Sequence, residues 1–385
     1  MGLFLPAYFQ AIQRWLAQVV PGGDSMNAFL GANRVMLIND RPDRTLADVF
    51  YGSFLPQINI SYENLIPAIE QFYREVYPQL RSLTAPAPGA KETVQSLHEA
   101  GHLLVVATNP RFPASAIHQR VDWANLPLKS SDFELVTAFE RFHFAKPNPA
   151  YYAEIMAFLG WPEGPAVMVG HEAANDIRAA AELGLATYHV IDAGRAAGPP
   201  TARHGSGSLA DFPNWLTAQS EEDLEPDYRS AAGVTAVLKS TASALHSLVR
   251  EAEPQAWLGR RDGQWSPLET LAHLRDVEAE VNLKRAENFL ETESPFITGV
   301  DTDRWYADGF GDLPPAAEIL DEFLRSRLKT LDILAGVPID AWDMPARHSI
   351  FGPTDLMEIV SIMAGHDRTH MRHIQTGLES GTSGG

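Results

Sequence analysis

Two histidines one helical turn apart are the first residues of this sequence that could do chemistry. His366 and His370 are four residues apart, so in a helix both imidazoles lie on one face and can bind one metal ion. His273 lies in a second segment of helical pattern. Three histidines from two facing helices make a site with open coordination positions, which suits zinc, nickel or iron. The pair His366 and His370 also has a simpler explanation without a metal, in which one histidine packs in the core and the other lies on the surface.

A second group of candidate residues follows short apolar segments in the first half. Thr108 ends one such segment, Lys146 precedes Pro147, and Asp176 follows the apolar segment 166–170. Because parallel sheets bind ligands at the carboxyl ends of their strands, we expect these three side chains to lie close together. The hydroxyl and the ammonium would contact phosphoryl oxygens, and the carboxylate would bind Mg²⁺. Taken singly, Lys146 is also explained as a loop lysine and Asp176 as a helix cap.

The elements that must position this second group alternate along the chain. Short apolar runs predict strands at 103–108, 133–138, 166–170 and 187–191. Amphipathic segments predict helices at 90–100, 149–159, 173–183 and 209–216. Such alternation predicts an α/β doubly wound, Rossmann-like sheet. Residues 1–85 have a helical pattern and are expected to form a helical cap region.

The second half predicts an all-α four-helix bundle. Helical periodicity and two capping-box spacings place its helices at 231–251, from 266, 315–334, and from 355. No strand pattern is recognised after residue 226. The run Gly194 to Gly207 is rich in small residues and is interpreted as the approach to a linker. We therefore expect four parts: an α/β domain at 1–215 (cap 1–85, core 86–215), a linker at 216–228, a bundle at 229–377 and a flexible tail at 378–385.

The first half resembles the haloacid dehalogenase-like hydrolase superfamily. Val106-Ala107-Thr108-Asn109 is similar to its second motif, Lys146-Pro147 to its third, and the segment from Gly170 to Ile177 to its fourth. The resemblance covers residues 1–215. It implies a phosphatase-type hydrolase in which Thr108 and Lys146 contact the phosphate and Asp176 lies near Mg²⁺.

Two departures from this family bear on activity. Its first motif is an apolar strand ending in Asp-x-Asp, whereas this sequence begins at Met1-Gly2-Leu3-Phe4-Leu5-Pro6, which resembles the helix after that motif. Asp40 and Asp43 do not supply the pattern, and His171 stands where the fourth motif has aspartate. We therefore expect a domain without nucleophile or central strand, either inactive or N-terminally truncated, with a trimmed start favoured. Mg²⁺ is expected only if a missing N-terminal segment completes the site.

The second half resembles the DinB-like superfamily across about residues 226–377. The resemblance is carried by Trp265-Ser266-Pro267-Leu268-Glu269-Thr270-Leu271-Ala272-His273-Leu274 and by Gly365-His366-Asp367-Arg368-Thr369-His370. It implies a divalent metal (zinc, nickel or iron) held by His273, His366 and His370, and a homodimer formed through the bundle. Relatives resemble thiol S-transferases or metal-dependent hydrolases, and many have no known reaction.

Composition narrows the choice of partners. The net charge of −19 argues against nucleic-acid binding, and the absence of cysteine excludes thiolate metal sites and disulfides. No run of about 18 apolar residues predicts a membrane span. We expect a cytoplasmic, metal-dependent transferase or hydrolase acting on a small-molecule substrate and fused to the phosphatase-type domain. The alternative is a non-enzymatic metal-binding or sensing protein with a degenerate phosphatase scaffold.

Overall fold

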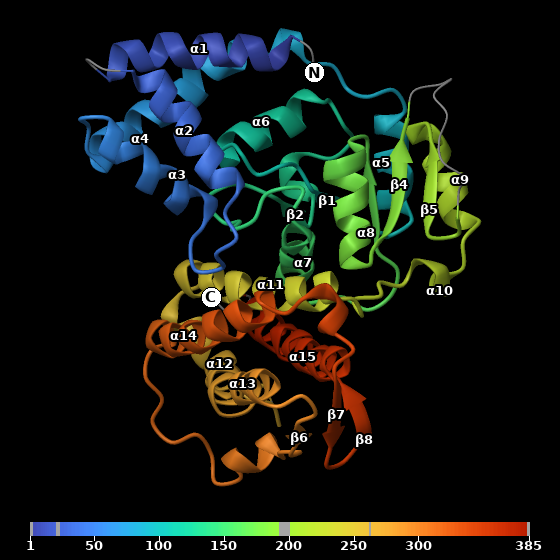
Figure 1. Cartoon of the computed structure of the whole chain (residues 1–385). Coiled ribbons are helices and arrows are strands. Elements are labelled where there is room, and N and C mark those ends of the chain that lie inside the picture. The colour runs from blue at the N-terminus through green and yellow to red at the C-terminus, as the bar shows by residue number, and fades with distance from the viewer. Residues whose placement is uncertain (1–2, 21–23, 192–200, 262, 383–385) are drawn as a thin grey trace. The chain divides into compact units, whose positions relative to one another are not determined.

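The computed structural model describes residues 3–20, 24–191, 201–261 and 263–382 (Figure 1). The chain divides into two compact units, each assembled from several segments. The first comprises Met1–Asn148, Val167–Arg178 and Ala186–Leu224. The second comprises Pro149–Ala166, Ala179–Leu185 and Glu225–Gly385.

The N-terminal part of the first unit is helical, as the sequence predicts. Its helices and helical turns are α1 (Phe4–Val19), α2 (Ser25–Leu37), α3 (Leu46–Phe54), η1 (Leu55–Gln57), α4 (Tyr62–Gln71), the π-helical η2 (Phe72–Val76) and η3 (Tyr77–Leu83). A capping box between Thr45 and Asp48 starts α3. Aromatic side chains fill much of the interior of this region, among them the buried Phe54, Phe72 and Tyr77.

Parallel strands alternate with helices in the next part of this unit, which therefore has an α/β fold. The strands are β1 (Val105–Val106), β2 (Leu135–Val136), β3 (Val167–Gly170), β4 (Ala186–Val190) and β5 (His204–Gly207). The helical elements in this part of the unit are α5 (Ala90–Glu99), α6 (Ala114–Trp123), η4 (Ser130–Asp132), η5 (Ala173–Arg178), η6 (Leu209–Asp211), α9 (Phe212–Thr217) and α10 (Glu221–Leu224). The described strands form two parallel sheets, β1-β2 and β3-β4-β5, where the sequence predicts one continuous sheet.

Strand β5 corrects one sequence prediction. Residues 204–207 were expected in the approach to a linker, yet they pair in parallel with β4. The small residues there serve close packing: a Cβ on Gly205 would lie 2.4 Å from the Trp215 ring, and one on Gly207 would lie 2.4 Å from the Tyr188 hydroxyl. Residues 194–200 of the expected linker approach lie outside the described residues.

The second unit contains the bundle. Its long helices are α11 (Ala231–Glu251), α12 (Pro267–Val277), α13 (Leu283–Glu291), α14 (Ala316–Ala335) and α15 (Leu356–Thr382), and the π-helical η8 (Glu278–Asn282) joins α12 to α13. Its short helical turns are η7 (Pro254–Leu258), η9 (Thr302–Tyr306) and η10 (Ile339–Ala341). Helices α11 and α12 each pack against both α14 and α15, which makes the core of the bundle.

Two helices from the middle of the sequence belong to this second unit. They are α7 (Pro149–Phe158) and α8 (Ala179–Leu183), which the sequence pattern groups with the α/β domain. All the residues of α7 from Ala150 to Phe158 are buried, and α7 packs along α11. Arg372 of α15 donates to the Trp161 carbonyl at 2.8 Å, just after α7.

Two further predictions for the bundle are wrong. A small sheet, β6 (Phe296–Ile297), β7 (Pro345–His348) and β8 (Gly352–Asp355), occurs where no strand was expected, because strands of two to four residues are too short to show alternation. Helix α15 also extends to Thr382, through most of the expected flexible tail, because Leu378 is buried against the bundle. Residues 383–385 of that tail lie outside the described residues.

Candidate functional site

A reciprocal cap at the start of α12 positions the first histidine. The Ser266 hydroxyl accepts a hydrogen bond from the Glu269 N–H at 3.2 Å, and the Glu269 carboxylate accepts one from the Ser266 N–H at 2.8 Å. Arg260 donates to the same carboxylate at 2.9 Å. This cap fixes where α12 begins. His273 lies two turns further along and is fully buried.

Helix α15 supplies the other two histidines from its buried face. A stripe of buried apolar residues, Leu356, Ile359, Val360 and Met363, runs along this face. His366 and His370 continue the same spacing of three or four residues. Asp355 accepts a hydrogen bond from the Glu358 N–H at 2.8 Å at the start of the helix.

The three histidines converge on one point. The Nε2 atoms of His273 and His366 are 3.0 Å apart, and one ligand nitrogen from each of the three residues lies within 4.8 Å of the other two. The ring centroid of His370 lies 4.6 Å from that of His273 and 4.4 Å from that of His366. Three imidazoles at this spacing form a possible binding site for one metal ion.

The electrostatics of the cluster favour neutral imidazoles. Burial, followed by His273, Arg327 and Arg285, lowers the pKa of His366 to about 3. Burial and the neighbouring imidazoles lower the pKa of His370 to about 2. Because a metal binds the unprotonated ring nitrogen, protons do not compete for these two ligands near neutral pH.

Aromatic rings flank the histidines. The Trp265 ring is stacked on His370, with 12° between the planes, and its centroid lies 5.0 Å from that of His273. Tyr306 approaches His273 to 5.7 Å between centroids and stacks on Phe310 at 3.9 Å. The Tyr306 hydroxyl donates to Asp276 at 2.6 Å, and burial followed by this bond raises the pKa of Tyr306.

Three other aromatic residues of the bundle differ in their exposure and in their distance from the histidines. Tyr306 lies beside the cluster, Trp305 is 42% exposed, and Trp342 is buried. Trp265 lies at the start of α12 and Phe310 lies in a loop. Helical spacing in the sequence therefore could not identify either residue as part of the site.

A buried charge network lies on the helices that carry the site. Arg327 of α14 donates to Asp367 at 2.6 and 3.1 Å and to Glu278 at 2.8 Å. Thr330 donates to the other oxygen of Glu278 at 2.6 Å. Asp367, the neighbour of His366, is bonded to Arg327. Asp276, on the same helix as His273, is bonded to Tyr306 and to Arg275.

Arg285 of α13 adds a positive charge near the cluster. Its Nε is buried without a hydrogen-bond acceptor, and its guanidinium forms no ion pair with the described residues. Burial lowers the pKa of Arg285, and its charge contributes to the lowered pKa values of His366 and His348. This cation therefore lies close to the metal-site candidate.

Comparison with known proteins agrees with both halves of this description. A model of the haloacid dehalogenase-like hydrolases matches residues 7–184, and a model of the DinB superfamily matches residues 237–374. The chain joins a haloacid dehalogenase-like hydrolase domain to a DinB superfamily domain. No curated protein matches the chain.

One solved structure is similar to part of the chain. It is YfiT from Bacillus subtilis, described as a probable metal-dependent hydrolase with an unusual four-helix bundle topology. The identity is 18% and the TM-score 0.34, over 43% of this chain and 91% of that chain. Within the described residues, no helix is both long and apolar enough to cross a membrane.

In the haloacid dehalogenase-like domain, the structure brings Lys146 and Asp176 together. Lys146 Nζ donates to Asp176 Oδ1 at 2.6 Å and to the Ala107 carbonyl at 2.7 Å. The other oxygen of Asp176 accepts hydrogen bonds from the N–H groups of His171 and Glu172, both at 3.0 Å. Burial lowers the pKa of Lys146, and the nearby Asp176 opposes that shift.

The remaining predicted residue of that site, Thr108, follows β1. Its carbonyl accepts a hydrogen bond from the Thr137 hydroxyl at 2.8 Å, beside the Ala107 carbonyl that binds Lys146. Gly170 makes the close approach of Asp176 possible, because a Cβ there would lie 2.4 Å from the Cβ of Asp176. The described contacts thus join Lys146 to Asp176, and the Thr108 backbone follows the Ala107 carbonyl that Lys146 contacts.

Proposed function

We propose that the DinB domain is a metal-dependent enzyme, a hydrolase or a transferase, and that His273, His366 and His370 hold its divalent metal. The observation that carries this proposal is the convergence of three ring nitrogens within 4.8 Å. The set contains nitrogen donors alone, which suits zinc, nickel or iron and leaves positions for water or substrate.

The residues around the histidines have separate tasks in this proposal. Trp265 and Phe310 would exclude water from one side and contact the apolar part of a small-molecule substrate. Asp276 holds the Tyr306 hydroxyl in place, so that the ring of Tyr306 keeps its position beside His273. When bound, the metal would lower the pKa of a bound water or thiol, which serves either reaction class.

Metal analysis of variants tests the site before any reaction is known. The full chain is expected to bind one equivalent of zinc or nickel, and His273→Ala is expected to lose it. His373→Ala is the matched control, because His373 lies on α15 one turn from His370 but outside the cluster. Equal metal content in His273→Ala and the unaltered chain would contradict the assignment.

Activity assays then distinguish a metal-dependent enzyme from a non-enzymatic metal-binding or sensing protein. Thiol-transfer and hydrolase substrates are assayed with the metal-loaded chain, with His366→Ala as the blank. Turnover that depends on His366 supports the enzyme. Stoichiometric metal binding without turnover in either panel favours the non-enzymatic metal-binding or sensing protein.

For the haloacid dehalogenase-like domain we propose negligible phosphatase activity in the chain as printed. The described residues bring Asp176 and Glu172 toward Lys146, but Asp176 is bonded to Lys146 and to two N–H groups and is not free to attack phosphorus. An aspartyl-phosphate forms only on a free carboxylate nucleophile, and Asp176 does not offer one. Turnover of p-nitrophenyl phosphate with Mg²⁺ that disappears in Asp176→Ala would overturn this proposal.

A further inference from the structure

Two hydrogen-bond donors of the DinB domain have no acceptor among the described residues. They are the guanidinium of Arg285, on α13, and the ring Nε2 of His348, on β7. We propose that these two groups bind a carboxylate of the substrate, so that the DinB domain acts on small molecules that carry a carboxylate apart from the group at the metal. This inference rests on the proposed metal site and adds the class of substrate.

The small sheet brings His348 to the face of α13 that carries Arg285. Asn288 of α13 donates to the Phe296 carbonyl of β6 at 3.5 Å. Strand β6 pairs with β7, and Ile297 is the partner of His348 in that pairing. Arg285 precedes Asn288 by three residues, so the two side chains lie on one face of the helix. Burial, followed by the charge of Arg285, lowers the pKa of His348, which agrees with this placement.

The surroundings of His348 fix which ring nitrogen carries the proton. Its Nδ1 accepts hydrogen bonds from the N–H groups of Ile350 and Phe351, at 3.2 and 3.3 Å. The ring is neutral at neutral pH, because its pKa is lowered, and its single proton is therefore on Nε2. The Phe351 ring stacks on the imidazole at 4.6 Å between centroids and holds its orientation. His348 thus offers one N–H donor and no charge.

Arg285 supplies the charge for an anion. Its Nε is buried without an acceptor, and no carboxylate of the described residues pairs with its guanidinium. Partial burial of a cation without an anion is costly, because the lost hydration is not replaced. A guanidinium can donate to both oxygens of one carboxylate, so a ligand carboxylate would supply the missing acceptors.

The carboxylate site is separated from the three histidines along the helix. Arg285 follows His273 by twelve residues through α12, η8 and α13, which is about 18 Å along a helix axis. The long side chain shortens this gap: after burial, His273 and Arg327, the charge of Arg285 also lowers the pKa of His366. Arg285 and His366 are both partly exposed, so one ligand can reach them. The substrate is therefore expected to be extended, with several bonds between its two binding groups.

Dicarboxylic acids in which one carboxyl group is converted to a hydroxamate test this arrangement. The hydroxamate binds zinc, and the remaining carboxylate is available to Arg285. Succinic, glutaric and adipic monohydroxamates are compared by calorimetry, on the zinc-loaded full chain, with the matching hydroxamates that carry an amide in place of the carboxylate. For at least one length, the carboxylate ligand should bind about tenfold more tightly than its amide. Equal affinities of acid and amide at all three lengths would overturn the proposal.

Two variants assign this preference for the carboxylate, at saturating zinc so that changes in zinc affinity do not enter. Arg285→Gln should abolish the preference while the amide ligands bind as before, and Arg285→Met replaces it if the Gln variant is unfolded. His348→Asn should reduce the preference about threefold. The Asn oxygen can still accept from the N–H groups of residues 350 and 351, whereas the Nε2 donor is lost. An undiminished preference in a folded Arg285 variant would contradict the assignment.

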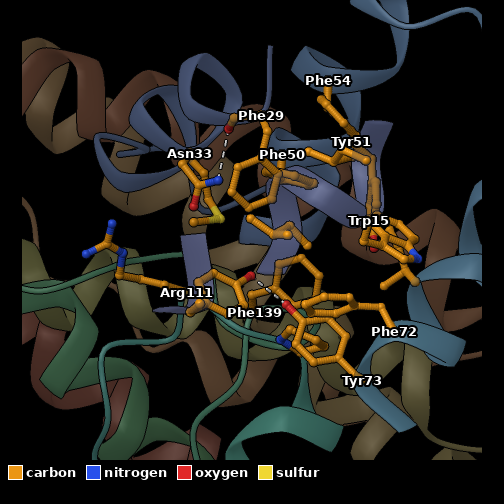
Figure 2. A pocket seen from close by; sticks show the side chains of 16 residues that line it. Trp15, Phe29, Asn33, Phe50, Tyr51, Phe54, Phe72, Tyr73, Arg111 and Phe139 are labelled. Atoms are coloured by element: carbon orange, nitrogen blue, oxygen red, sulfur yellow. Dashed lines mark hydrogen bonds between the residues drawn. The ribbon is translucent and has the colours of Figure 1, made fainter. Parts of the chain in front are cut away.

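Two other cations are controls for net charge. Lys284 is the residue before Arg285, exposed and paired with Glu280. Arg111 belongs to the first unit, where it lines a cavity with many aromatic rings, and its guanidinium also has no ion pair among the described residues (Figure 2). Lys284→Gln and Arg111→Gln remove the same charge as Arg285→Gln and should retain the preference for the carboxylate. If either control loses the preference as fully as Arg285→Gln does, the assignment to Arg285 falls.

The zinc content of each preparation separates this inference from the proposed function. A chain that binds no zinc at the three histidines would contradict both. A chain that binds zinc but does not distinguish the carboxylate ligands from their amides would contradict the carboxylate site alone.

Discussion

Arg327 donates to both oxygen atoms of Asp367, at 2.6 Å through Nη1 and at 3.1 Å through Nη2. Neither side chain is exposed to solvent, and Glu278 is the third member of the buried group. Asp367 is the neighbour of His366 in α15, and Glu278 follows α12 by one residue. The network therefore ties α14 to both helices that carry metal-site histidines.

Loss of Arg327 should destabilise the chain strongly. Arg327→Met leaves two carboxylates buried without their cation, and breaking a buried pair of this kind costs about 3–5 kcal/mol. The free energy of unfolding, measured in urea by circular dichroism, should fall by that amount. Arg229→Met is the control: it removes an exposed ion pair with Asp227 and should leave the free energy of unfolding unchanged. Similar losses in the two variants would show that the buried network is not special.

The buried histidines should make the metal-free chain sensitive to acid. The folded pKa values of His366 and His370, about 3 and about 2, are below the ordinary value of 6.5. The unfolded chain therefore binds more protons between pH 6.5 and about 3, and stability falls as pH falls through this window. Urea unfolding in EDTA, from pH 7.5 to 4.5, should show a steeper decline in the unaltered chain than in His366→Gln/His370→Gln. Parallel profiles would contradict the neutral state of these imidazoles.

The residues of the candidate metal site could be predicted from the sequence more completely than the strands of the sheets. His366, His370 and His273 were predictable because helical spacing and the Ser266 capping box are local signals. Trp265 and Arg327 were not, because their roles come from packing between helices. Strand β5 was not predicted, because a segment that contains Gly205 and Gly207 has the composition of a linker. Only the positions of Trp215 and Tyr188 show why these two residues must be glycine.

The cap of α12 should contribute measurably to stability. Ser266→Ala removes the hydroxyl that accepts from the Glu269 N–H, which costs about 1 kcal/mol at a typical helix start. Ser266→Thr keeps a hydroxyl and should recover most of that loss. Both are compared by urea unfolding. A Thr variant as unstable as the Ala variant would indicate a steric effect at this buried position instead of a lost cap.

Arg285 should weaken metal binding at the three histidines. Its charge already disfavours protonation of His366, and it must disfavour a divalent cation at the same place for the same electrostatic reason. Because no carboxylate among the described residues pairs with its guanidinium, that repulsion is not cancelled locally. Arg285→Met is therefore expected to tighten zinc binding about fivefold, on the order of 1 kcal/mol, in competition with a fluorescent chelator. Lys284→Met is the matched control, because Lys284 is the adjacent residue, exposed and paired with Glu280, and its loss should change the affinity less than about twofold. Weaker zinc binding in Arg285→Met would mean that the guanidinium supports the site structurally, and that its charge is not what governs affinity.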